Sequence, residues 1–204
     1  AGRGVVPVPA TPTDYEKDIA RMHTAEFLTA NCVVRRQAMQ AIGGFDERFT
    51  AAWREDSDLQ FRLLRNFGTV VALPAAIVEH PVRAPEGWFH NLKQHRKIVF
   101  DALLYKKHPQ MYRERIRRSP PWHYYAIVLG ALVALFWPIW QPAVKWVGFA
   151  AWFLLTAAFC ARRLRGTSRS PRHVLQMVVT SIAIPFVAVY WRLAGALRFR
   201  VFFL

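Results

Sequence analysis

The last 90 residues of the chain contain no acidic residue, and this limits the folds that they can adopt. Three apolar runs without a charged side chain lie there, at residues 124–140, 146–161 and 174–191. Each run has nearly the length, about 17–20 residues, that crosses a bilayer as a helix. A helical bundle of a soluble protein would need acidic or amide residues on its solvent-exposed faces. We therefore expect residues 113–204 to form a membrane region with three transmembrane α-helices over these runs.

The charges that flank the runs predict an orientation. Arginines precede the first run and separate the second from the third, whereas only Lys145 lies between the first two. Because positively charged loops stay in the cytoplasm, residues 1–122 and the loop at 162–173 are expected there, at a bacterial inner membrane. Arg192, Arg198 and Arg200 follow the third run, and Pro185 lies inside it. That run is therefore open to a kinked, a re-entrant or an interfacial placement.

Residues 1–112 carry both signs of charge and are interpreted as a cytoplasmic domain with helices and strands. Helices are expected near residues 15–27, 35–42, 58–66 and 87–105, and Gly43 and Gly68 are expected to end the second and third. Short strands are expected at 29–34, 69–73 and 76–79, after a loop at 1–13. Asp56 or Ser57 is the expected N-cap of the third helix.

Five acidic residues fall within residues 46–58 of a chain whose formal net charge is +15. Glu55 and Asp56 stand just before a helical pattern, where free N–H groups and the helix dipole keep a carboxylate ionised. Such a carboxylate, facing a cleft, can take a proton from an attacking sugar hydroxyl. Asp56 is thus a candidate general base, and Glu55 a candidate for orienting the acceptor. A plain helix cap at Asp56 is the alternative, and Asp58 is interpreted as helix-start chemistry.

Three sequence blocks together resemble the acceptor-side half of family 2 glycosyltransferases. They are Thr-Ala-Asn-Cys-Val-Val-Arg-Arg at 29–36, Gly-Gly-Phe-Asp-Glu-Arg-Phe at 43–49 and Glu-Asp-Ser-Asp-Leu-Gln-Phe-Arg-Leu at 55–63. The resemblance implies an α/β fold of the A type that binds a nucleotide sugar, a divalent Mg or Mn ion, and inversion by direct displacement. It also implies that Asp56 is the general base. The residues that the resemblance places on the acceptor side of the cleft are Asn31, Gly44, Phe45 and Asp46.

Two further residues and one departure follow from this resemblance. His80 resembles a histidine with which some relatives contact the metal or the diphosphate, and Arg83 could contact a leaving diphosphate; a purely structural role is the alternative. The uridine-binding strands and the metal-binding Asp-x-Asp have no counterpart here, so the main metal ligands are expected upstream of Ala1. We therefore expect the chain to be a C-terminal portion that is inactive alone. Residues 94–97 match the motif of processive members only loosely.

The sequence thus predicts a membrane-bound glycosyltransferase that moves a sugar from a nucleotide-sugar donor to a membrane-associated or lipid-linked acceptor, in the synthesis of a cell-envelope polysaccharide. The basic residues between Lys93 and Arg118 either flank the membrane or bind anionic lipid or a lipid diphosphate. Nucleic acid is not expected as a partner, because these cations already have a membrane explanation. The alternative is a non-catalytic membrane anchor or interaction module. A transporter fragment is disfavoured, since no Asp, Glu, Lys, Arg or His lies within 124–140 or 146–161.

Overall fold

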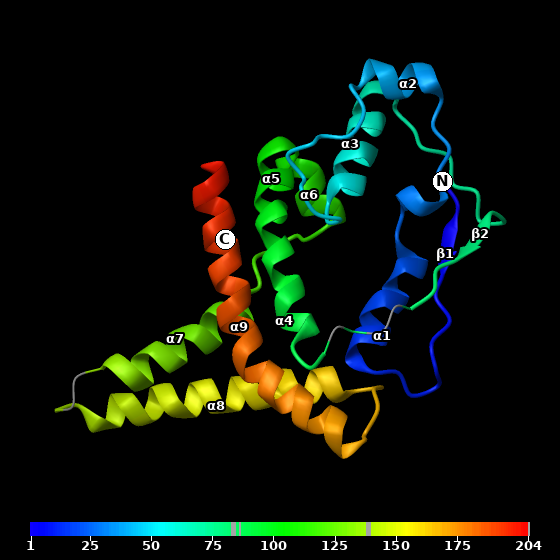
Figure 1. The fold of residues 1–204 in the computed structure, drawn as a ribbon. Coiled ribbons are helices and arrows are strands. Elements are labelled where there is room, and N and C mark those ends of the chain that lie inside the picture. The colour runs from blue at the N-terminus through cyan, green and yellow to red at the C-terminus, as the bar shows by residue number, and fades with distance from the viewer. Residues whose placement is uncertain (83–84, 86, 138–139, 204) are drawn as a thin grey trace.

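The computed structural model describes residues 1–82, 85, 87–137 and 140–203 and is mostly helical (Figure 1). One helix, α3, lies between the N-terminal segments and the pair α5 and α6, while α7 and α8 form a hairpin that projects from the rest. The elements, with η for 3-10 helices, are β1 Arg3–Val5, α1 Asp14–Ile19, η1 Ala20–Thr24, η2 Thr29–Asn31, α2 Arg36–Ala41, α3 Glu55–Phe67, β2 Ile77–Glu79, α4 His90–Gln94, η3 His95–Ile98, α5 Val99–Lys107, α6 Pro109–Arg115, α7 Trp122–Phe136, α8 Pro142–Leu164 and α9 Pro171–Phe199.

Helix α3 holds the domain together because it buries two faces. Leu59 and Leu63 pack against Phe27 in one apolar cluster. Phe61, which is fully buried, packs into a second cluster built mainly from α5, α6 and the C-terminal end of α9. Burying one such side chain contributes about 1.5–3 kcal/mol. The helix ends at Gly68, whose φ of 78° is the left-handed conformation that favours glycine, as the sequence predicted.

The strands β1 and β2 form a two-stranded parallel sheet in which Arg3 pairs with Ile77 and Val5 with Glu79. Strand β1 lies in the segment that was expected to be a loop. The strands expected at 29–34 and 69–73 are wrong for the described residues: the first contains the 3-10 turn η2, and the second is irregular. A strand needs a neighbouring strand to form its backbone hydrogen bonds. The side chains of Val33 and Val71, which would favour a strand, stay exposed to solvent. The α/β expectation is therefore met only by this small sheet.

The helices α7 and α8 pack closely along their length because two glycines face the contact. A Cβ on Gly130 would lie 2.9 Å from the backbone nitrogen of Trp152, and one on Gly148 would lie 2.7 Å from a side-chain carbon of Val133. At about 1.5 Å per residue, α7 is about 22 Å long and α8 about 35 Å. Helix α7 ends earlier than expected because Trp137, which precedes a proline, takes extended backbone.

Helices α8 and α9 are long and apolar enough to cross a membrane, and α7 is a shorter apolar helix. Helix α9 runs from Pro171 to Phe199 without a break at Pro185. It packs against α4, η3 and α5 of the domain as well as against α7 and α8. A Cβ on Gly195 would lie 2.8 Å from the carbonyl oxygen of Val99, so the backbones of α9 and α5 approach closely. The third apolar run is thus part of one continuous helix that packs along the domain.

Candidate functional site

The two candidate catalytic carboxylates belong to the first turn of α3, which begins at Glu55. The N-cap is Arg54, and the expectation of Asp56 or Ser57 in this position is wrong. Arg54 has a φ of 75°, a left-handed conformation that costs a residue with a side chain about 1–2 kcal/mol. Its side chain makes a short hydrogen bond to Asp101, 2.6 Å from Nε to Oδ1. This long-range bond holds Arg54 in place, so that α3 begins at Glu55, one residue before Asp56.

Asp101 is buried in α5 and gathers three donors around its carboxylate. Besides Arg54, the indole nitrogen of Trp53 donates to Oδ2 at 3.2 Å and the hydroxyl of Tyr112 donates to Oδ1 at 3.3 Å. Burial, followed by the negative charge of Asp101, raises the pKa of Tyr112 well above its usual range, so this phenol keeps its proton and remains a donor. Asp101 therefore fixes the residues that lead into α3, a role that its sequence context did not reveal.

Glu55 and Asp56 differ in how their oxygens are used. Oδ1 of Asp56 accepts from the backbone nitrogen of Ser57 at 2.6 Å and from its hydroxyl at 3.3 Å. Oδ2 of Asp56 enters none of the hydrogen bonds or ion pairs found among the described residues. Oε2 of Glu55 is buried without a hydrogen-bond partner there. Burial, with the charge of Asp56 adding to it and Lys97 opposing it, raises the pKa of Glu55.

Asp58, in the same motif, lies at the centre of a buried ion network. Its Oδ1 is 2.5 Å from Nζ of Lys107 and 2.9 Å from Nε2 of His108, and its Oδ2 accepts from Nε of Arg62 at 2.8 Å. Burial alone would raise the pKa of Asp58, but His108 and Lys107 outweigh it and lower the pKa. These contacts tie α3 to Lys107 at the end of α5 and to His108, which directly precedes α6.

The predicted acceptor-side residues take up different places. Asp46 joins the ion network. The hydrogen bonds from Arg48, and then that from Lys107 at 2.5 Å from its Oδ2, hold the pKa of Asp46 well below its usual range. Gly44 has a φ of 71° in the turn after α2, and the Phe45 side chain beside it is 47% exposed. Asn31 donates its amide to the carbonyls of Arg3 and Ala76, which joins η2 to the sheet.

His80 directly follows β2, where its backbone nitrogen donates to the carbonyl of Val5 at 2.8 Å. Its Nδ1 is buried without a hydrogen-bond partner among the described residues. No hydrogen bond or ion pair found in that part of the chain joins His80 to Glu55 or Asp56. Arg83 lies outside the described residues. The diphosphate role expected of these two residues stays a prediction.

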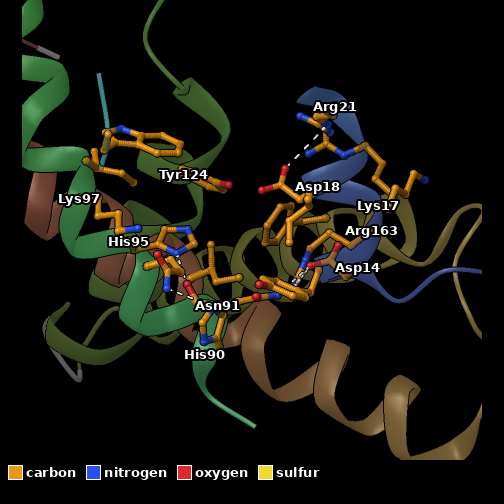
Figure 2. Close-up of a pocket in the computed structure, with 18 of the residues that line it drawn as sticks. Asp14, Lys17, Asp18, Arg21, His90, Asn91, His95, Lys97, Tyr124 and Arg163 are labelled. Carbon is orange, nitrogen blue, oxygen red and sulfur yellow. Dashed lines mark hydrogen bonds and ion pairs between the residues drawn. The ribbon is translucent and has the colours of Figure 1, made fainter. Parts of the chain in front are cut away.

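A cavity of about 910 Å³ opens where the domain meets the apolar helices (Figure 2). Figure 2 shows Lys97 and His95 on one wall and the α1 residues Asp14, Lys17 and Asp18 on the opposite wall. Arg163 of α8 connects the segments that line the cavity. It donates to Asp14 of α1 at 2.7 Å and to the hydroxyls of Thr180 and Ser181 of α9. Trp53 also lines the cavity, two residues before Glu55. The start of α3 and the cavity are therefore neighbours.

The residues present were also compared with what a divalent metal requires. No group of three or more His, Cys, Asp and Glu side chains is arranged to hold a metal ion in the part of the chain that the structure describes. Asp56 and Asp58 point to different surroundings, because Asp58 is fully buried among cations. The described residues thus do not fit a metal site by themselves.

The comparisons with known proteins complete this description. The model of a family described as "Glycosyl transferase family group 2" matches residues 14–191. The matched part includes Glu55 and Asp56, the ion network around Asp58 and all residues named above for the cavity. Neither the curated proteins nor the solved structures gave a match.

Proposed function

The chain belongs to glycosyl transferase family group 2, and we propose that it serves the transfer of a sugar from a nucleotide-sugar donor to an acceptor at a membrane surface, with Asp56 as the general base. The observation that carries this proposal is the placement of Asp56. It stands in the first turn of α3 with one carboxylate oxygen held by Ser57 and the other left without a partner among the described residues. Trp53 and Lys97 bring a large cavity next to this turn.

The geometry supports a direct displacement. Oδ2 of Asp56 takes the proton of the acceptor hydroxyl while the hydroxyl oxygen forms a bond to the anomeric carbon of the sugar. The bond from that carbon to the nucleoside diphosphate breaks on the opposite face, so the configuration inverts and the diphosphate leaves with the electron pair. Glu55, whose pKa is raised by burial, can hold a hydrogen bond to the acceptor through its unpartnered Oε2. Asp58 takes no part, because its oxygens are committed to cations.

We also propose that the domain lies on the cytoplasmic face of the membrane and that α7 and α8 enter the bilayer. Large apolar side chains on this hairpin are exposed to a degree that water would disfavour, as for Leu135 at 69% and Val147 at 68%. Arginines cluster where α8 ends and before α7 begins, the side that the positive-inside rule assigns to the cytoplasm. A cell-envelope polysaccharide or its lipid-linked precursor is the acceptor class that suits this location.

The test measures transfer of a labelled sugar in membranes that contain the enzyme as its gene encodes it, with a panel of nucleotide sugars. The double variant Glu55→Gln/Asp56→Asn should lose the activity while the protein remains in the membrane at its normal level. Full activity of this variant would favour a non-catalytic anchor instead. Residues 1–204 alone are expected to show no transfer, because segments for the nucleotide and the metal have no counterpart in this sequence; transfer by this chain would contradict that part of the proposal.

A further inference from the structure

The cavity between the domain and the apolar helices carries a strong excess of positive charge. Among its described lining residues are six cationic and two acidic side chains. The six are Lys17, Arg21, Lys97, Arg117, Arg162 and Arg163. Asp14 and Asp18 are the two acids. A cavity with this balance attracts an anion, because like charges gathered around a concave wall reinforce one another's potential.

The two acids neutralise only part of this charge. Asp14 is paired with Arg163, 2.7 Å from Oδ2 to Nη2, and Asp18 lies 3.8 Å from Arg21 in an exposed pair. The side chains of three cations, Lys97 of η3, Arg117 before α7 and Arg162 of α8, form no hydrogen bond or ion pair with any described residue. These three come from different segments that are distant in the sequence, and all of them reach the same space.

The cavity also has an apolar side, and that side belongs to the helices that face lipid. Tyr124 in the first turn of α7 and Phe159 near the end of α8 line it and pack against each other at 5.4 Å between ring centres. Ile184 of α9 completes this wall. Because α7 begins and α8 ends here, the cavity lies at the depth where lipid headgroups meet the apolar helices. An occupant thus meets cations at one end and aromatic and aliphatic walls at the other.

We propose that this cavity binds the phosphate or diphosphate headgroup of a membrane lipid, with Lys97, Arg117 and Arg162 as its contacts. A phosphate group supplies several acceptor oxygens, and each guanidinium offers donors in a planar fork that matches them. The apolar chain leaves along Tyr124 and Phe159 toward the membrane. That the bound lipid is the sugar acceptor rests on the proposed function, whereas the binding itself does not.

The test uses the full chain in detergent, without any donor sugar, and three probes. Farnesyl diphosphate carries both features, inorganic pyrophosphate carries only the charge, and farnesol carries only the apolar chain. Farnesyl diphosphate should bind at least about tenfold more tightly than either of the others, since each of them lacks one of the two contacts. Equal affinity for inorganic pyrophosphate would overturn the assignment to a lipid, and equal affinity for farnesol would overturn the phosphate contacts.

Single variants locate the binding. Lys97→Gln, Arg117→Gln and Arg162→Gln should each weaken farnesyl diphosphate binding by about tenfold, the loss expected for one charge-assisted hydrogen bond. Arg169→Gln is the matched control, because it removes the same charge from an exposed loop residue that does not line the cavity. Its affinity should stay within about twofold of that of the wild type. An equal loss in this control would show that only the overall charge attracts the ligand and would overturn the proposal.

A measurement on the wild-type protein avoids any question about the folding of the variants. Farnesyl diphosphate should slow the acetylation of Lys97, measured by mass spectrometry, and should leave that of the exposed Lys93 in α4 unchanged. Equal protection of both lysines, or of neither, would overturn the proposal. The Asp56→Asn variant should bind the probe as the wild type does. Normal probe binding together with undiminished transfer by Asp56→Asn would refute the proposed function alone, whereas unchanged binding by Arg162→Gln would refute the cavity assignment alone.

Discussion

The carboxylates of Asp56 and Asp58 belong to one motif, but their contacts differ. The side chain of Asp58 is fully buried, and Lys107, His108 and Arg62 occupy its oxygens. Asp56, two residues earlier, keeps one oxygen without a partner among the described residues. The spacing of two residues places their side chains on different sides of α3. The interpretation of Asp58 as helix-start chemistry missed its contacts with Lys107 and His108, because these two residues lie about fifty positions later in the sequence.

The substitution Asp58→Asn should destabilise the fold by about 3–5 kcal/mol, since it leaves Lys107 and Arg62 without their buried counter-charge. The pKa of Asp58 is lowered in the folded protein, so its contribution is present above the usual carboxyl pKa of about 4 and is lost as the pH falls through the lowered value. Stability measured by urea unfolding between pH 7 and pH 2.5 should therefore fall less steeply with acid in the variant.

The matched control is Glu47→Gln, which removes an exposed acid from the turn beside Asp46. Its stability should stay within about 0.5 kcal/mol of the wild-type value, as for most surface substitutions. A loss as large as that of Asp58→Asn would mean that net charge, rather than the buried network, sets the stability of this region.

At the scale of elements, α9 is the helix whose role the structure changes most. Its length and composition would let it cross a membrane, yet both of its ends are bonded to the domain. Gln176 near its start donates to the carbonyl of Trp88, and Lys106 of α5 donates to the carbonyl of Phe199 at its end. Arg192 is buried within this contact, with its guanidinium 4.0 Å from the ring centre of Phe203. We therefore expect α9 to lie along the membrane surface, the interfacial option among those that the sequence left open.

Cysteine labelling tests this placement in a background of Cys32→Ser and Cys160→Ser. Arg172→Cys and Arg200→Cys mark the two ends of α9, and both residues are exposed. Both should react with a membrane-impermeant maleimide from the same side, the cytoplasmic one, in inverted membrane vesicles. Gln141→Cys, in the connection between α7 and α8, should react from the other side and serves as the control. Labelling of positions 172 and 200 from opposite sides would show that α9 spans the bilayer.

The elements that the sequence predicted well depend on local signals. Helix α2 and its end at Gly43, and α3 and its end at Gly68, follow from apolar periodicity and from glycines in the left-handed conformation. The start of α3 was misplaced because Arg54 is held by Asp101, 47 residues away. The strands at 29–34 and 69–73 were misjudged because their residues have β propensity but no partner strand among the described residues. The family resemblance was confirmed, since three spaced motifs carry more information than any single element.

At the scale of the whole molecule, the contacts connect the candidate catalytic turn to the apolar helices. Asp101 of α5 holds Trp53 and Arg54 ahead of α3, and α5 in turn packs on α9. On the other side of the cavity, Arg163 of α8 binds Asp14 of α1. The domain is therefore held against the apolar helices on both sides of the cavity. If the apolar helices enter the bilayer as proposed, Asp56 is held at a fixed distance from the lipid surface, as the proposed transfer to a membrane-held acceptor requires.

The most direct test of the general-base assignment is the kinetic comparison of Asp56→Asn with the wild type in membranes that contain the enzyme as its gene encodes it. Asparagine keeps the shape and the hydrogen bond to Ser57 but cannot take a proton. We predict that kcat falls by about 10²–10⁴-fold, the usual contribution of a general base, while KM for donor and acceptor stays nearly constant. An unchanged kcat, or a loss that appears only in KM, would contradict the assignment of Asp56 as the base.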